Sequence, residues 1–152
     1  MRIPTLLTLL SFTGSASAAG TAAVHVFAPT GGTVPLGLSL TTPLTHAAPV
    51  NLAVRGDLLM FPGLGAPLAL SALLVAELPS GPVFTPYAGA GIGTASVFTQ
   101  TGWTVHPTWT AVAGVRAAIQ GGLGLSVEAR ASRAALGVAV GLTIQAPTGS
   151  PQ

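Results

Sequence analysis

The sequence predicts an all-β fold, an eight-stranded antiparallel up-and-down transmembrane β-barrel, on three observations. Large apolar residues alternate with small or polar ones in short segments, which is the period of a β-strand. Charged residues make up only 5% of the 152 residues, against roughly 25% in soluble domains. Six of the eight charged residues lie within these segments on the face opposite the large apolar residues, and they are Arg55, Asp57, Glu77, Arg116, Glu128 and Arg130. Lipid accommodates such strands when the polar face points into a closed lumen, so we expect these six side chains to form a lumen ion network.

Residues 1–19 have the composition of a secretory signal peptide. Arg2 provides a positive start, an apolar stretch runs to Phe12, and small residues at 15–19 suit cleavage. The apolar stretch is too short to span a bilayer, although a retained membrane anchor is the alternative interpretation. We therefore expect a cleaved signal peptide at 1–19, an outer-membrane β-barrel at 20–146 and a disordered tail at 147–152.

The first three predicted strands follow this leader. The first covers 21–28 and ends at the turn residues 29–32. The second alternates leucine with small residues, and its leucines are Leu36, Leu38 and Leu40. A turn at 43–49, which contains His46, leads to the third strand, whose charged residues lie opposite its apolar residues.

The fourth predicted strand, 68–78, places Glu77 on the inner face. A transmembrane helical hairpin is the alternative here, because the segment 58–78 is apolar enough for a helix. Pro62 and Pro67 argue against that alternative, since an interior proline removes a helical hydrogen bond and clashes with the preceding turn.

The fifth predicted strand covers 85–95, and the polar segment Ser96–Pro107 that follows is expected to be a long loop. If both termini are periplasmic, this loop lies outside the cell, as the long loops of such barrels do. Exposed tryptophan is a frequent binding anchor, so Trp103 is the expected surface contact, with His106 as a second candidate.

The last three predicted strands cover 108–120, 123–130 and 136–145. Residues directly opposite each other in an antiparallel pair share a face, which restricts the loop lengths between strands. A three-residue loop at 121–123 would place Arg116 opposite Glu128 and join opposite charges inside the lumen. The same arithmetic permits Arg55 to lie opposite Glu77.

Three blocks of sequence carry a resemblance to a known family. They are Pro86-Tyr87-Ala88-Gly89-Ala90-Gly91-Ile92-Gly93, Leu125-Ser126-Val127-Glu128-Ala129-Arg130 and Val138-Ala139-Val140-Gly141-Leu142-Thr143-Ile144. These blocks resemble strands of the small outer-membrane β-barrels of the outer-membrane-protein-A and opacity-protein kind. The resemblance implies an eight-stranded closed barrel in an outer membrane. Members of that family commonly end on an aromatic residue used in assembly, whereas this chain ends on Gln152. Its aromatic girdle is thin, with Trp103, Trp109, Tyr87 and a few phenylalanines as candidates.

The composition excludes several classes of function. The chain has no cysteine, which excludes disulfides and thiolate metal sites. It has no basic patch, so nucleic acid is not an expected partner. The three histidines, His25, His46 and His106, match no metal-ligand spacing, and we expect neither a metal nor another cofactor.

These observations predict a structural or adhesin-like role in the outer membrane. The expected partners are membrane lipid and a surface or cell-wall ligand that binds through Ser96–Pro107. Side chains fill an eight-stranded barrel, which favours structural pairing of the lumen charges over a pore. The alternatives are a small lipid-acting barrel enzyme that uses His106, a narrow channel, and a secreted soluble β-sandwich. We assign no catalytic residue from the sequence.

Overall fold

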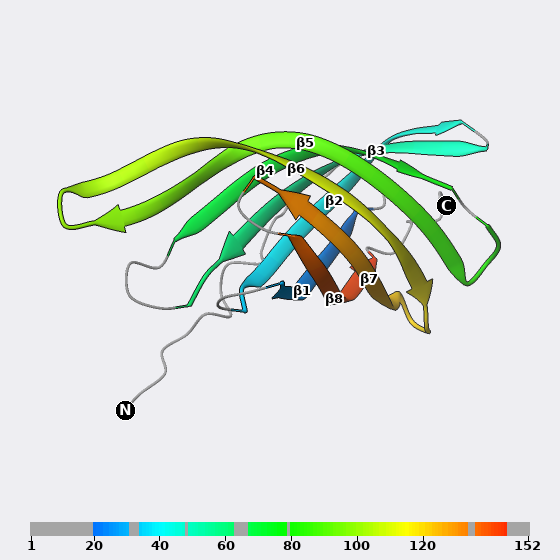
Figure 1. Cartoon of the computed structure of the whole chain (residues 1–152). Coiled ribbons are helices and arrows are strands. Elements are labelled where there is room, and N and C mark those ends of the chain that lie inside the picture. Colours follow the sequence, from blue (N-terminus) through cyan, green and yellow to red (C-terminus); the bar gives the residue numbers. More distant parts are fainter. Residues whose placement is uncertain are drawn as a thin grey trace, which may run out of the picture.

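Eight antiparallel strands pair in chain order and close into a barrel in the computed structural model of this chain (Figure 1). The strands are β1 Thr21–Pro29, β2 Leu36–Ala47, β3 Val50–Met60, β4 Leu68–Glu77, β5 Phe84–Thr99, β6 Gly102–Ala118, β7 Leu123–Ser132 and β8 Leu136–Gln145. The structure describes residues 20–30, 34–47, 49–62, 67–78, 80–133 and 136–145, without the side chains of His46, Ala47 and Phe98. The predicted signal peptide at 1–19 and the predicted tail at 147–152 lie outside these residues.

Pairing between the first and last strands closes the sheet. β1 pairs with β2 on one side and with β8 on the other, from Thr21 opposite Gln145 to Pro29 opposite Gly137. A closed sheet pairs its backbone polar groups from strand to strand, which is the condition for β-structure in lipid. The predicted fold class, an eight-stranded antiparallel up-and-down barrel, is confirmed.

The helical hairpin considered for 58–78 is wrong. β3 and β4 form an antiparallel pair that runs from Asn51 opposite Glu77 to Met60 opposite Leu68. Within the described residues, no helix is long and apolar enough to cross a membrane.

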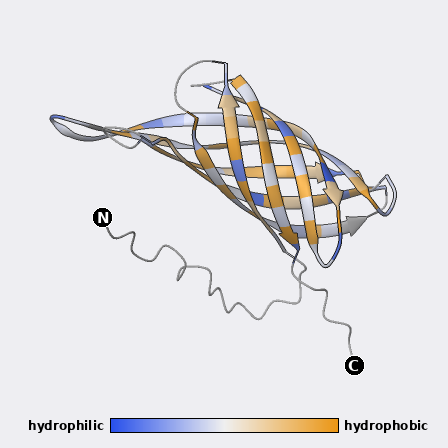
Figure 2. Ribbon diagram, turned by 90° about the horizontal axis from the view of Figure 1, so that it is seen from below, coloured by the Kyte–Doolittle hydropathy of each residue, from blue (hydrophilic) through white to orange (hydrophobic). Residues whose placement is uncertain are grey.

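The outer surface of the barrel wall is apolar. Hydrophobic residues recur along the strands in Figure 2, and along β8 from Leu136 to Ile144 every second residue is exposed while those between are buried. A continuous apolar exterior of this kind is compatible with lipid, whereas in water it would promote aggregation. We call the outward apolar residues the lipid-facing belt, which includes Val24, Val26, Leu38, Leu40, Val54, Leu70, Leu74, Ile92, Trp109, Val127, Val138, Val140 and Leu142.

Inward glycines allow β5 to approach β4 closely. A Cβ atom at Gly91 would lie 1.9 Å from the carbonyl oxygen of Ala72, and one at Gly93 would lie 1.9 Å from that of Leu70. Only glycine fits at such positions, and it permits the strong curvature of β5 that is visible in Figure 1. The alternating glycines that begin at Gly89 therefore have a structural role, since they allow β5 to pack closely against β4.

Two predicted turns are strands in the structure. β2 continues to Ala47, so His46 lies within a strand. The predicted loop Ser96–Pro107 is also wrong, because β5 extends to Thr99 and β6 begins at Gly102. This segment contains three threonines, two valines, a phenylalanine and a tryptophan, all of which favour strands, so its polar residues did not indicate a loop.

The register between β6 and β7 differs by two residues from the prediction. Gly114, and not Arg116, lies opposite Glu128. The hydrogen bond from the amide of Ile119 to the carbonyl of Leu123 encloses residues 120–122, so the turn lies one residue earlier than the predicted 121–123. A shift of two residues leaves every side chain on its own face, so alternation alone does not exclude it.

The predicted pairing of Arg55 with Glu77 across β3 and β4 is wrong for the same reason. Arg55 lies opposite Leu73, and Glu77 lies opposite Asn51. Both residues keep the inward orientation that the alternation predicts. The connection between β3 and β4 sets a register that differs from the predicted one by an even number of residues, so the faces are unchanged.

Candidate functional site

Four charged side chains form a closed ring of alternating sign in the lumen. Arg55 Nε lies 2.6 Å from Asp57 Oδ1, and Arg130 Nη1 lies 2.7 Å from Asp57 Oδ2. On the other side of the ring, Arg55 Nη1 donates to Glu128 Oε2 and Arg55 Nη2 lies 3.3 Å from Glu128 Oε1. Arg130 Nη1 closes the ring at 3.6 Å from Glu128 Oε1. We call these four residues the ion ring, and its formal charge is zero.

The order of charges along two strands explains why the ring forms. β3 carries Arg55 and Asp57 two residues apart, and β7 carries Glu128 and Arg130 at the same spacing, so each pair shares the inward face. β3 and β7 run in the same direction in an antiparallel barrel and lie on opposite walls. Arginine on one strand therefore faces glutamate on the other, and aspartate faces arginine. This reciprocal order is a sequence signal for pairing across the lumen, where we had expected pairs between neighbouring strands.

The ion ring is shielded from solvent. The side chains of Arg55 and Arg130 are each 5% exposed, that of Asp57 is 2% exposed and that of Glu128 is 0% exposed. Charges at this depth are tolerated only when they are paired and hydrogen-bonded, because each loses its hydration. The attraction within the network therefore adds little net stability, because it is offset by the desolvation of the charges. Removal of one member is nevertheless costly, because it leaves a buried charge without its partner.

Tyr87 links the ion ring to a second ion pair. Its hydroxyl donates to Glu128 Oε2 at 2.9 Å, and the guanidinium carbon of Arg116 lies 5.6 Å from the centre of its ring. Arg116 Nη2 in turn donates to Glu77 Oε1 at 3.1 Å. This pair lies nearer the end of the barrel that holds both termini, and its side chains are 12% and 16% exposed. Tyr87 was predicted as a residue of the aromatic girdle, which is wrong, because its side chain is buried in the lumen and its residue is 4% exposed.

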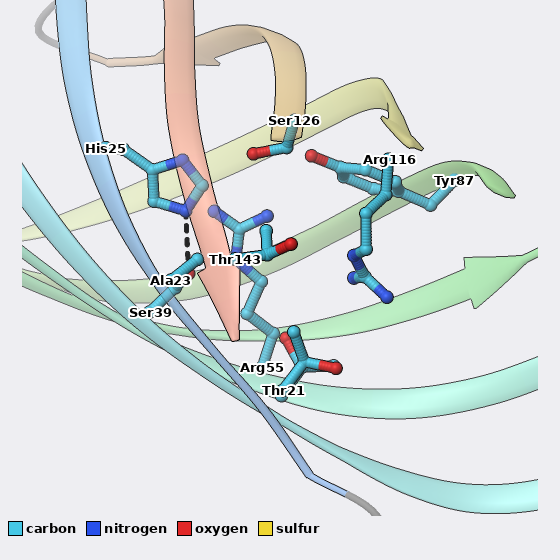
Figure 3. Close-up of a pocket in the computed structure, with 10 residues that line it drawn as sticks. Thr21, Ala23, His25, Ser39, Arg55, Tyr87, Arg116, Ser126 and Thr143 are labelled. Carbon is cyan, nitrogen blue, oxygen red and sulfur yellow. Dashed lines mark hydrogen bonds between the residues drawn. The ribbon is translucent and has the colours of Figure 1, made fainter. Parts of the chain in front are cut away.

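A small polar cavity lies beside these groups (Figure 3). His25 from β1 points into it and makes a 2.8 Å hydrogen bond between its Nε2 and the hydroxyl of Ser39. The cavity has a volume of about 10 Å³, which is room for about one water molecule. The residues that line it are Thr21, Ala23, His25, Ser39, Thr41, Arg55, Tyr87, Arg116, Ser126 and Thr143. Side chains of the described residues therefore fill the part of the lumen that surrounds this cavity.

The β5–β6 hairpin extends beyond the rest of the wall (Figure 1). β6 pairs with β5 from Gly102 onward, whereas its pairing with β7 begins only at Thr110. Trp103 is 58% exposed on the outward face of this extension, and His106 is exposed on the opposite face. The structure therefore brings the six lumen charges together in two connected groups, and it places Trp103 and His106 apart from them and on different faces.

The described residues offer little for metal or acid–base chemistry. Among them, no three His, Cys, Asp or Glu side chains come together as ligands for a metal ion. All three acids of the chain are engaged in the lumen, while His106 lies on the hairpin. A histidine-based hydrolase would need an orienting carboxylate near His106, and the lumen carboxylates are held by arginine.

Comparisons with known proteins identify the class of fold. No protein-family model matches the chain, and no curated protein matches its sequence. The N-terminal β-barrel domain of Pseudomonas aeruginosa OprF is similar in structure at 11% identity, with a TM-score of 0.71 over 85% of this chain and 98% of that domain. The Yersinia pestis outer-membrane protein Ail is similar at 10% identity, with a TM-score of 0.58 over 85% of this chain and 99% of Ail.

The outer-membrane enzyme PagL is also similar in structure, at 16% identity and a TM-score of 0.56 over 82% of this chain and 98% of PagL. These likenesses show that the chain has the fold of the small eight-stranded outer-membrane β-barrels, which confirms the resemblance seen in the sequence. Because the fold is shared by an enzyme and by proteins of other kinds, it does not decide the activity.

Proposed function

We propose that this protein is an outer-membrane barrel with a structural and surface-contact role. The lipid-facing belt holds it in the membrane, the ion ring closes its lumen, and the β5–β6 hairpin meets the surroundings outside the cell. The observation that carries the proposal is the length of this hairpin, whose residues 102–109 extend past the last pair between β6 and β7. Trp103 and His106 are its candidate contact residues, one on each face.

The charge of the hairpin narrows the class of partner. Ail, which has a similar fold, has been solved in complex with the heparin analogue sucrose octasulfate. This chain has no Asp, Glu, Lys or Arg between Glu77 and Arg116, so its hairpin lacks the fixed positive charge that a sulfated sugar requires. We propose an uncharged surface or cell-wall ligand, recognised by apolar contacts and by the hydroxyl groups of the hairpin.

Two other functions find less support. A channel would need a polar path, and the lumen is filled by the ion ring and its neighbours. A lipid-acting enzyme is the alternative from a different class, with His106 as its candidate residue, since the outer-membrane enzyme PagL has a similar fold. His106→Ala would abolish lipid turnover by such an enzyme, and the contact role predicts identical lipid composition in cells with and without the substitution.

The test of the contact role compares the full chain with a variant whose hairpin is shortened. Val97 and Thr104 lie directly opposite each other and form a hydrogen-bonded pair in the alternation that begins at Val83 and Ala118, so an Asn-Gly turn in place of residues 98–103 closes the hairpin without changing its register. Cells carrying either protein are then measured for adhesion to peptidoglycan, an uncharged polysaccharide and heparin. We expect the full chain to adhere to one of the first two surfaces and the shortened variant to lose that adhesion. Equal adhesion of both proteins on all three surfaces would refute the contact role.

A further inference from the structure

We propose that the polar cavity beside the ion ring is a binding site for one single-atom anion, such as chloride, held between His25, Thr143 and Arg116. The site belongs to the lumen and not to the β5–β6 hairpin, so the inference goes beyond the contact role and does not depend on it. The bound anion joins β1 and β8, the two strands that close the barrel, to β6.

A row of directly opposite residues brings the polar groups to one place. Arg116 of β6 lies opposite Ser126 of β7. Ser126 in turn lies opposite Gly141 of β8, and Gly141 lies opposite His25 of β1. Opposite residues in antiparallel strands share a face, so the whole row faces the lumen, and Figure 3 shows its side chains around the cavity. Thr143 follows two residues after Gly141 on the same inward face of β8.

Two glycines leave space for the polar atoms of this cavity. A Cβ atom at Gly141 would clash with His25 Nδ1 and would lie 2.8 Å from Ser126 Oγ. A Cβ atom at Gly124, which lies opposite Thr143, would be 2.6 Å from Thr143 Oγ1. The lumen wall is therefore hollowed at the positions where His25 and Thr143 present their polar atoms.

Three polar atoms at the cavity have no hydrogen-bond partner among the described residues. They are His25 Nδ1, Thr143 Oγ1 and Arg116 Nε, and each of these atoms is buried. His25 and Thr143 are only 5% and 2% exposed. A buried polar atom without a partner is costly, so three of them around one cavity indicate a ligand that pairs with all three.

The hydrogen-bonding groups and the charges favour an anion. Arg116 Nε can only donate. We assign the Ser39 hydroxyl as the donor to His25 Nε2, 2.8 Å away, so Nδ1 carries the ring proton and donates as well. The Thr143 hydroxyl is free to donate the third bond. Among the described residues that line the cavity, Arg55 and Arg116 are charged and none is an acid. A ligand that accepts several hydrogen bonds and carries negative charge matches this set.

The size of the cavity selects a single-atom anion. Its volume is about 10 Å³, which is room for about one water molecule. Sulfate, phosphate and carboxylates have several heavy atoms and do not fit, whereas chloride is close to water in size. Thr21, the first residue of β1, also lines the cavity, which places it toward the end of the barrel that holds both termini. The aqueous phase at that end is the source of the anion.

Urea unfolding in detergent micelles tests the site in solution. Chloride is compared with gluconate, which is too large for the cavity, at constant ionic strength. Thr143→Val removes one donor at nearly constant volume. The matched control is Thr110→Val, which makes the same change at a buried inward residue that does not line the cavity. An anion that binds only the folded barrel stabilises it by mass action.

We expect the unfolding constant of the unmodified protein and of Thr110→Val to fall by at least about tenfold as chloride replaces gluconate from about 0.01 to about 1 M. Thr143→Val should lose most of this dependence. An unfolding constant of the unmodified protein that does not respond to chloride, or an equal response of the two variants, would overturn the inference.

Crystals of the unmodified protein grown in bromide locate the anion without any variant. Bromide replaces chloride and gives an anomalous diffraction signal, and we expect its peak within hydrogen-bond distance of Arg116 Nε and His25 Nδ1. A cavity with an ordered water and no bromide peak would refute the anion site. The adhesion assay of the shortened hairpin involves none of these residues, so the contact role and the anion site stand or fall separately.

Discussion

Replacement of Glu128 by glutamine is the perturbation that the lumen geometry predicts most firmly. Glu128 accepts hydrogen bonds from Arg55 and Tyr87, and it lies 3.6 Å from Arg130. Glutamine has nearly the same shape and still accepts from the Tyr87 hydroxyl. The change therefore removes charge while it preserves volume, and the ion ring is left with two arginines against Asp57.

The expected magnitude follows from the burial of the ring. The side chain of Glu128 is 0% exposed and those of its arginine partners are 5% exposed, so water does not replace the lost carboxylate. Breaking a buried ion pair by removing one partner costs about 3 to 5 kcal/mol. The unfolding constant should rise by roughly two to three and a half powers of ten. Glu77→Gln is the matched control: its pair with Arg116 is less deeply buried, and we expect a smaller cost of about 1 to 3 kcal/mol, that of one lost hydrogen bond to a charged group.

The assay is reversible urea unfolding in detergent micelles, followed by tryptophan fluorescence and by mobility in dodecyl sulfate gels. A second variant checks the mechanism, because Glu128→Gln combined with Arg55→Gln restores a neutral ring of one arginine and one aspartate. We expect the double variant to be less destabilised than the sum of the two single changes by about 2 kcal/mol. If Glu128→Gln costs no more than Glu77→Gln, or if the double variant is simply additive, the ion ring is not the buried network described above.

The remaining predictions concern the wall of the barrel. Gly91→Val should prevent assembly, because the first carbon of any side chain there would lie 1.9 Å from the carbonyl oxygen of Ala72; Gly56→Ala, which adds a carbon with no heavy atom within 4 Å, should assemble as the unmodified chain does. A heat-shifted band from Gly91→Val of normal intensity would contradict the close approach of β4 and β5. Leu74→Arg should cost about 2 to 4 kcal/mol, because Leu74 is 53% exposed in the middle of β4, where the wall faces hydrocarbon. Leu78→Arg, just past the end of β4, should cost about 1 kcal/mol or less in the same urea titration, and equal costs at both positions would argue against a membrane-spanning β4.

Alternation in the sequence was sufficient to predict the fold and the faces of the strands. Arg55, Asp57, Glu128 and Arg130 all point inward as the period of two residues requires, and the leucines of β2 point outward. This prediction was possible because the lipid-facing side of a transmembrane strand must be apolar. The few polar residues of such a strand therefore lie on the lumen side.

The registers and the hairpin could not be predicted in the same way. Placing Arg116 opposite Glu128 satisfied the alternation, and so does the observed Gly114, since the two registers differ by an even number of residues. Turn geometry decides between them, and it depends on backbone contacts such as the one between Ile119 and Leu123. The cross-lumen pairing of β3 with β7 follows from closure into eight strands together with the reciprocal order of charges on the two strands, whereas the predicted pairs joined neighbouring strands only.

The length of β5 and β6 was missed for a different reason. The segment Ser96–Pro107 contains polar residues typical of loops, yet its β-branched and aromatic residues alternate with them as in a strand. The polar composition of the segment suggested a loop, whereas its two-residue period indicates a strand. Trp103 was nonetheless singled out from the sequence, and its role as a contact residue stays a prediction.

Gel mobility of the membrane-extracted protein in dodecyl sulfate, with and without boiling, tests the closed membrane barrel most directly. A barrel sealed by the pairing of β1 with β8 resists the detergent until it is heated, so the unboiled protein should migrate as a compact species and the boiled protein as an extended chain. Identical mobility before and after boiling, with the protein recovered in the soluble fraction without detergent, would contradict the account and favour a secreted β-sandwich.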